Sequence, residues 1–261
     1  MKNQLMLGAL ALAFSLGGTT ASAQVAHNTT PKTEVTKADP QAYELLRHAQ
    51  SLRESFPRDF IGFKAELVCN DNGKTATGTL DYTTAGGVKF EMTGLSEATA
   101  AWLKQELSSL LMHRRAGDFA QGDGRHPLTL PADDHSPLGR QVLVNDKLKS
   151  SYRIRENGQT AEVDRTMGPE RIVITILETT ATSPGKFMPR HFVMNAFDAK
   201  TSAMLRSQTY TEEFARVEGV WLPASRRIVT AEEGKLTARV ITIRNAQLHK
   251  AAATPQVGQG Q

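Results

Sequence analysis

The most suggestive chemistry in the sequence stands at His113-Arg114-Arg115, the end of a long helical pattern. Guanidinium groups hold a carboxylate or a phosphate through paired hydrogen bonds, so this cluster can serve as an anion site. A structural explanation is also simple, because cations stabilise the negative end of a helix. The loop that follows offers three acidic partners for such a cap: Asp118, Asp123 and Asp133. The sequence leaves both interpretations open.

Metal ligands and catalytic motifs give weaker signals. The histidines do not show the i, i+4 or H-x-H spacings that are common in metal sites, and Cys69 is the only cysteine. The motifs of serine hydrolases, zinc proteases and phosphate-binding loops are missing from the chain. We therefore predict no metal, no cofactor and no catalytic residue. An unrecognised hydrolase remains an alternative, and it would need a nucleophile within hydrogen-bond reach of a histidine.

Large apolar residues favour binding over catalysis. Aromatic side chains and methionines suit an adaptable apolar surface, although an ordinary filled core would use the same residues. Together with the basic cluster they give the candidate ligand-binding residues, which are Phe90, Met92, Trp102, Leu103, Leu110, His113, Arg114, Arg115, Phe192 and Met194.

Two helices are predicted to position these candidates. Ser96 is a good N-cap and Glu97 favours the positive start of a helix, and the leucines that follow form a broad apolar stripe. This spacing predicts a helix over residues 96–115. Asp39-Pro40 opens an earlier amphipathic helix that runs to about residue 55.

The rest of the chain is patterned for strands. Alternating apolar residues separated by turn sequences such as Asp71-Asn72-Gly73 and Glu156-Asn157-Gly158 indicate antiparallel hairpins. The predicted strands are 60–70, 74–82, 88–92, 142–144, 148–155, 159–167, 171–180, 190–197, 204–217, 220–229 and 236–243. Two helices cannot cover a flat sheet of this size. We therefore predict an α+β fold, a large curved antiparallel sheet (a half-barrel) with about two helices on its concave side, wrapped around the helix 96–115.

The N-terminal residues carry an export signal. Lys2, the apolar run 5–16 and Ala21-Ser22-Ala23 predict a signal peptide over residues 1–23, cut near Ala23/Gln24. The run is shorter than the roughly 20 residues that span a bilayer. We predict a soluble periplasmic or extracellular protein, with a flexible leader (24–38), one half-barrel domain (39–249) and a disordered tail (250–261).

Charge and cysteine content narrow the choice of partners. The net charge is +4 and its basic residues are scattered, so no nucleic-acid partner is predicted. Cys69 alternates with Leu67 on one face of its strand and is predicted to be a core residue.

Several motifs carry a family resemblance: Phe60-Ile61-Gly62-Phe63, the helix end Leu110-Leu111-Met112-His113-Arg114-Arg115, and Gly219-Val220-Trp221-Leu222-Pro223. Over about residues 40–249 the chain resembles an uncharacterised bacterial family known only as a domain of unknown function, which implies no catalytic residues. More distantly, its layout resembles the LolA-like lipoprotein-carrier superfamily. That resemblance implies a half-barrel whose hollow holds acyl chains. Arg153, Arg155 and Arg165 depart from the apolar concave face that a carrier should have.

These observations favour an exported, non-catalytic protein of the bacterial envelope that binds an apolar or amphiphilic ligand, such as a lipid or a lipoprotein acyl chain. The expected place is between the sheet and the helix 96–115, with His113 to Arg115 near the polar end of the ligand. The alternative is a protein-interaction or structural module without a small ligand. Such a module would expose a large apolar patch, and pull-down of an envelope protein partner would test it.

Overall fold

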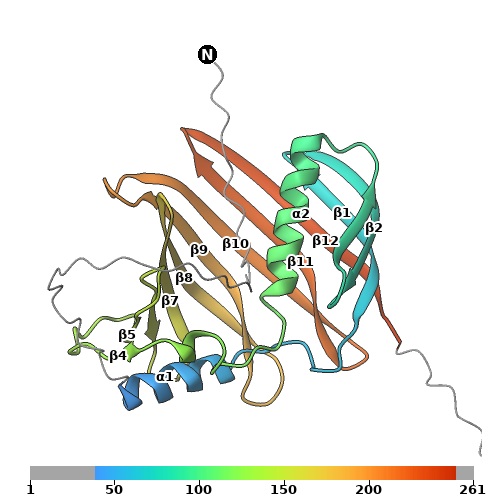
Figure 1. Cartoon of the computed structure of the whole chain (residues 1–261). Helices are drawn as coiled ribbons and strands as arrows, with labels where there is room; N and C mark the ends of the chain where they lie inside the picture. The colour runs from blue at the N-terminus through green and yellow to red at the C-terminus, as the bar shows by residue number, and fades with distance from the viewer. Residues whose placement is uncertain (1–38, 251–261) are drawn as a thin grey trace, which may run out of the picture. The chain divides into compact units, whose positions relative to one another are not determined.

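A computed structural model describes residues 39–250 of the chain, which form two α helices, one short 3-10 helix and twelve strands (Figure 1). The predicted signal peptide, leader and tail lie outside these residues, apart from Lys250, and stay predictions. No helix within residues 39–250 combines the length and the apolar character needed to cross a membrane. The helices are α1 (Pro40–Ser51), α2 (Glu97–Met112) and η1 (Asp123–Arg125). The strands are β1 (Gly62–Asp71), β2 (Lys74–Thr83), β3 (Gly87–Met92), β4 (Leu128–Thr129), β5 (Arg140–Val144), β6 (Ser151–Ile154), β7 (Thr160–Met167), β8 (Glu170–Ala181), β9 (Phe187–Asp198), β10 (Met204–Val217), β11 (Val220–Glu232) and β12 (Lys235–Leu248).

All twelve strands belong to one sheet, in the order β3-β2-β1-β12-β11-β10-β9-β8-β7-β6-β5-β4. Strands that follow one another along the chain pair directly, except β3 and β4, which α2 separates. The last strand, β12, returns to pair with β1 in an antiparallel register. This return joins the three strands before α2 to the nine strands after it. β3 and β4 form the two edges of the described sheet, which is curved and not closed (Figure 1). The predicted class, an α+β half-barrel with two helices, is confirmed.

Helix α2 covers the end of the sheet that contains β1. The Ser96 hydroxyl accepts a hydrogen bond from the Thr99 backbone N–H at 3.1 Å, as expected of the predicted N-cap. Leu103, Leu107 and Leu111 then face the sheet and are fully buried. They pack against a cluster from the inner face of neighbouring strands: Leu67, Cys69, Leu80, Ile241 and Ile243. The predicted core position of Cys69 is confirmed.

Helix α1 covers the opposite end of the sheet. The Asp39 carboxylate caps it by accepting from the backbone N–H of Gln41 at 2.8 Å. Phe119, Leu128 and Leu130 of the long loop pack against this helix. Its buried residues join a second cluster with β4, β5 and β6: Ala42, Leu46, Ala49, Val142, Val144, Tyr152 and Ile154. The helix ends at Ser51, four residues before the predicted end. The cause is strand-like pairing, because the Glu54 N–H donates to the Phe187 carbonyl at 2.8 Å.

The predicted strands are all present with shifted ends, but two short elements were not predicted. η1 and β4 are only three and two residues long, too short to show a period. β4 exists because Leu128 and Thr129 pair with Val144 and Leu143 of β5.

The helices therefore divide the inner face into three parts. Each of the two apolar clusters lies at one end of the sheet, and the central strands β7–β10 lie between them (Figure 1). The prediction that the sheet wraps around one helix was incomplete, because α1 supplies a second core.

Candidate functional site

Apolar side chains line the inner face of the central strands. Ile172 and Ile174 on β8 lie across from Ala196 and Met194 on β9, and Phe192 follows on the same face of β9. We call Ile172, Ile174, Phe192 and Met194 the apolar row. All four side chains are only half-buried, and none belongs to either core cluster. The Phe192 ring stacks on Tyr210, with ring centroids 4.6 Å apart and planes 7° from parallel.

The C-terminal ends of the two helices meet through Arg53. Arg53, just beyond α1, donates a hydrogen bond from Nη2 to the carbonyl of His113, the C-cap of α2, at 2.9 Å. The backbone of Arg53 also forms a bridge with Phe187 at the start of β9. Because the last carbonyls of a helix have no partner inside it, an arginine at this place satisfies one of them. This contact fixes Arg53 between the helices and the sheet.

A second arginine adjoins the row from β7. Arg165 pairs across the strands with Ile172. Its guanidinium donates to the Tyr152 hydroxyl, lies over the Tyr152 ring with its carbon 5.6 Å from the centroid, and stands 3.8 Å from an Asp123 carboxylate oxygen. Nε of Arg165 is buried and has no hydrogen-bond partner within residues 39–250. A buried N–H without a partner is unusual in a folded protein, so Arg165 keeps a donor that no residue of the described chain satisfies.

Asp123 is held in place from two sides. Its Oδ2 accepts from the Tyr152 hydroxyl at 2.5 Å and from Nε2 of Gln50, on α1, at 2.6 Å. Burial raises the pKa of Tyr152, so the hydroxyl stays protonated and donates to the carboxylate. Asp123 is therefore the anchor that joins the 3-10 helix, α1 and β6, and the carboxylate that offsets part of the charge of Arg165.

The His113 ring is neutral at pH 7. Its pKa falls to about 4, first because surrounding protein displaces water and then because Arg53, Arg226 and Arg165 lie close enough to disfavour a further positive charge. Solvent still reaches part of the side chain, which is exposed. Positive charge beside the apolar row therefore comes from the two arginines and not from His113.

This shift predicts a loss of stability in mild acid. Between pH 6.5, the ordinary histidine value, and about 4 the unfolded chain binds a proton at His113 that the folded chain does not. The contribution of His113 is thus present above pH 6.5 and is lost as the pH falls through about 4. Because solvent screens the ring, we expect less than about 1 kcal/mol. Urea unfolding at several pH values should show a smaller acid loss for His113→Gln than for the unchanged protein, and equal losses would contradict the assignment.

Arg114 does not point into a ligand site. Its guanidinium carbon lies 5.2 Å from the ring centroids of both Phe56 and Phe214, and Nη2 donates to the Trp221 carbonyl at 3.2 Å. Burial lowers its pKa to about 10, although Glu212 and Glu54 act in the opposite direction, so it stays charged at pH 7. This burial also explains why α2 ends at Met112 and not at residue 115, as the chain turns to insert Arg114 against the sheet.

The ion pairs predicted for the basic cluster are not found within residues 39–250. Asp133 pairs with Arg140 at 3.0 Å, and Asp123 neighbours Arg165. The structural interpretation of the cluster was therefore right that it stands at the end of α2, where His113 is the C-cap, and wrong about the acidic loop partners.

A buried ionic network connects α2 to the centre of the sheet. Arg226 on β11 donates from Nη1 to Glu106 of α2 and from Nε to Glu212 of β10, each at 2.9 Å. It also lies over the Tyr210 ring, with its carbon 5.3 Å from the centroid. Burial raises the pKa of Glu106, while Arg226 lowers it. Every one of these charged groups is less than 9% exposed, so the network itself is shielded from solvent.

The predicted ligand residues fall into separate places. Leu103 is buried in the core cluster beneath α2, so the expected position between α2 and the sheet is filled by side chains. Leu110 is also buried, outside that cluster. Trp102 lies at the margin of this core, under Arg239 with its guanidinium carbon 4.6 Å from the ring centroid. Phe90 and Met92 pack against the same core from β3. Arg115 is exposed. Phe192 and Met194 lie on the inner face of β9, and His113 lies near enough to Arg165 of β7 and Arg226 of β11 for their charges to lower its pKa.

One serine–histidine pair is relevant to the hydrolase alternative. Ser109 Oγ lies 3.3 Å from Nδ1 of His113. A general base works best with a pKa near the working pH and needs a third group to orient it. His113 has a pKa of about 4, and its Nε2 has no hydrogen-bond partner in the described part of the chain, so the pair lacks both features.

Among residues 39–250 no group of three or more potential ligands is placed to hold a metal.

A family model described as "Protein of unknown function (DUF3386)" matches residues 37–249. The chain belongs to this family. The resemblance to a domain-of-unknown-function family is thereby confirmed, and the description of DUF3386 names no activity. No curated protein matches the chain.

Two solved structures are similar in part to this DUF3386 chain. One is a DUF1329 family protein from Desulfovibrio piger ATCC 29098, with 10% identity, a TM-score of 0.33, and coverage of 84% of this chain and 96% of that one. The other is MucB in complex with MucA(peri), with 11% identity, a TM-score of 0.20, and coverage of 80% and 100%. Similarities at these TM-scores support no conclusion about function.

Four residues beside the apolar row were missed by the sequence as ligand candidates: Arg53, Asp123, Tyr152 and Arg165. Arg165 could have been found, because strand alternation places it on the same face as Val163 and Met167. Assigning each residue of this strand to one face of the sheet would have shown it. Arg53 carried none, because its contact with His113 joins residues 60 positions apart.

Proposed function

We propose that this protein is a non-catalytic binder of an amphiphile, a molecule with an acyl chain and an anionic head. The acyl chain lies along the apolar row on β8 and β9. The head lies toward Arg53 and Arg165. The observation that carries the proposal is the half-exposed apolar row, which neither core cluster includes although it lies between them.

The apolar part of the ligand follows from the chemistry of the row. Two isoleucines, one phenylalanine and one methionine meet on adjacent strands, and burial of apolar surface contributes about 25 cal/mol per Å². Each buried methylene of a ligand adds roughly 0.8 kcal/mol. Methionine adapts its shape to a flexible chain better than a branched residue does. An acyl chain therefore suits this surface better than a compact polar metabolite.

The anionic head follows from the neighbouring charges. Arg165 adjoins Ile172 and keeps a buried Nε without a partner among residues 39–250, and Arg53 is fixed between the helix ends. Asp123 is the carboxylate that stands beside Arg165. Since a guanidinium fork matches a carboxylate or phosphate, these arginines favour an anionic group over a neutral one.

Calorimetric titration of the full chain with oleate tests the proposal. We expect saturable binding near one oleate per protein. Monoolein, which has the same chain and a neutral head, should bind roughly tenfold more weakly, because charge-assisted hydrogen bonds contribute about 1.5–3 kcal/mol. The absence of saturable binding by both molecules would refute the function. Equal affinities for oleate and monoolein would refute only the role of the arginines and leave the acyl-chain site standing.

A further inference from the structure

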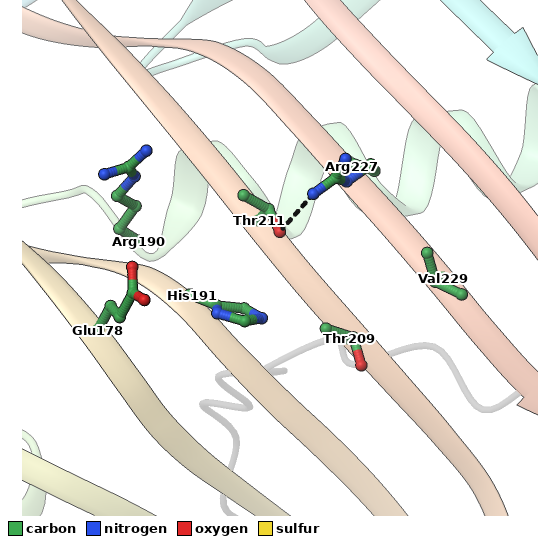
Figure 2. Close-up of a pocket in the computed structure, with 7 residues that line it drawn as sticks. All are labelled: Glu178, Arg190, His191, Thr209, Thr211, Arg227 and Val229. Carbon is green, nitrogen blue, oxygen red and sulfur yellow. Dashed lines mark hydrogen bonds between the residues drawn. The ribbon is translucent and has the colours of Figure 1, made fainter.

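The outer face of the sheet carries a second, different feature, a hollow of about 280 Å³ across β8 to β11. Alternation along the strands places it opposite the apolar row. On β10 and β11, Tyr210 and Ile228 pair on the inner face, so their neighbours Thr211 and Arg227 pair on the outer face. Figure 2 shows the residues that line the hollow: Glu178, Arg190, His191, Thr209, Thr211, Arg227 and Val229.

An irregularity in the pairing of β8 with β9 builds this hollow. The register shifts on both sides of Glu178, which lies across from His191, while Thr179 lies across from Pro189. Arg190 thus has no direct cross-strand partner on β8. In regular strands Arg190 and His191 would point to opposite faces, but a bulge can turn consecutive side chains to the same side. Both residues line the hollow for this reason.

The two arginines in the hollow form no ion pair with any carboxylate among residues 39–250. Arg227 donates only a long hydrogen bond, 3.4 Å, from Nη2 to the Thr211 hydroxyl, drawn as a dashed line in Figure 2. Arg190 and His191 form no ion pair or side-chain hydrogen bond within residues 39–250. By contrast, Arg171 and Arg206 elsewhere on the central strands pair with Asp164 and Glu170. Glu178 is the single acid that lines the hollow, and it has no partner within 4.0 Å among the described residues.

We propose that this hollow binds a phosphate-class oxyanion, held between Arg190 and Arg227. Two guanidinium groups offer fork-shaped donors to phosphate oxygens. The Thr209 and Thr211 hydroxyls line the floor and donate further hydrogen bonds. The volume lies at the lower limit of small-molecule pockets, roughly 300–1,000 Å³, so a compact anion fits better than a large cofactor. This site is independent of the amphiphile site, since it uses other residues on the other face.

Two probes distinguish the possible sources of the anion. Inorganic phosphate is titrated into the full chain and followed by calorimetry. Vesicles of phosphatidylglycerol mixed with phosphatidylcholine are tested for co-sedimentation, with pure phosphatidylcholine vesicles as the control. Binding of phosphate alone identifies a free anion, binding of the mixed vesicles identifies a lipid headgroup, and binding of neither overturns the proposal.

Three variants locate the binding. Arg190→Gln should weaken binding by on the order of tenfold, the loss typical of a charge-assisted hydrogen bond. Glu178→Gln should strengthen it severalfold, because it removes the acid from the hollow. Arg244→Gln, an exposed charge removal on β12 away from the hollow, should leave it unchanged. A gain for Glu178→Gln cannot result from misfolding. Equal affinities for all three variants would overturn the proposal.

Discussion

Replacing Ile174 with glutamate is expected to weaken oleate binding at least tenfold. The side chain lies at the centre of the apolar row, paired with Met194 on one side and Val163 on the other. A carboxylate there must either lose water against the acyl chain or keep the chain away, and both cost free energy. A tenfold change corresponds to about 1.4 kcal/mol, well within the cost of placing a charge against apolar surface. Calorimetric titration measures the effect.

Val173→Glu is the matched control for this prediction. Val173 is the preceding residue on β8, is also half-buried, and faces the outer side of the sheet. The two variants add the same charge to the same strand, so their losses in thermal stability should be comparable. If Val173→Glu weakens oleate binding as much as Ile174→Glu does, the inner face is not the binding surface.

Replacing Arg226 with methionine should lower the free energy of unfolding by about 3–5 kcal/mol. The change leaves Glu106 and Glu212 buried without their shared cation. Each carboxylate must then take up a proton or pull water into the core between α2 and the sheet, and either response costs free energy. Urea unfolding at neutral pH measures the difference.

Arg227→Met provides the comparison on the adjacent residue. This side chain is exposed on the outer face, so its loss should change stability by no more than about 0.5 kcal/mol.

The triple variant Arg226→Met, Glu106→Leu, Glu212→Leu should recover most of the stability that Arg226→Met loses, because an apolar replacement of a whole buried network is often tolerated. If Arg226→Met alone is as stable as the unchanged protein, the network is not buried in solution.

The elements of this fold were predictable where local chemistry decides them. Ser96 caps α2 and Asp39 caps α1 at the expected positions, since capping depends only on residues within one turn. Strand alternation likewise identified β1 and β10 almost to the residue. The open curved sheet was predicted because two helices cannot cover a flat sheet with so many strands.

The candidate site was predictable only in part, because long-range contacts define it. Phe192 and Met194 were named from their chemistry, but Arg53 is positioned by a hydrogen bond to the His113 carbonyl, a contact between two helix ends. Arg114 looked like an anion ligand in the sequence and is instead stacked between two phenylalanines. No local pattern distinguishes a basic residue that inserts into the core from one that faces a ligand.

The bulge between β8 and β9 illustrates the same limit on the outer face. The sequence around Arg190 reads as a regular strand, and the shift in register depends on how this strand meets Glu178 across the sheet. Cross-strand register is set by packing of both faces and not by one strand alone. The charged hollow that results has no signature in the sequence.

Methyl NMR during an oleate titration tests the proposed amphiphile site most directly. The methyl signals of Ile172, Ile174 and Met194 should shift in a saturable manner, while those of Ile241 and Ile243, which pack beneath α2, should not move. The opposite pattern, with shifts at Ile241 and Ile243 and none in the apolar row, would place the acyl chain under α2 and contradict the proposed site.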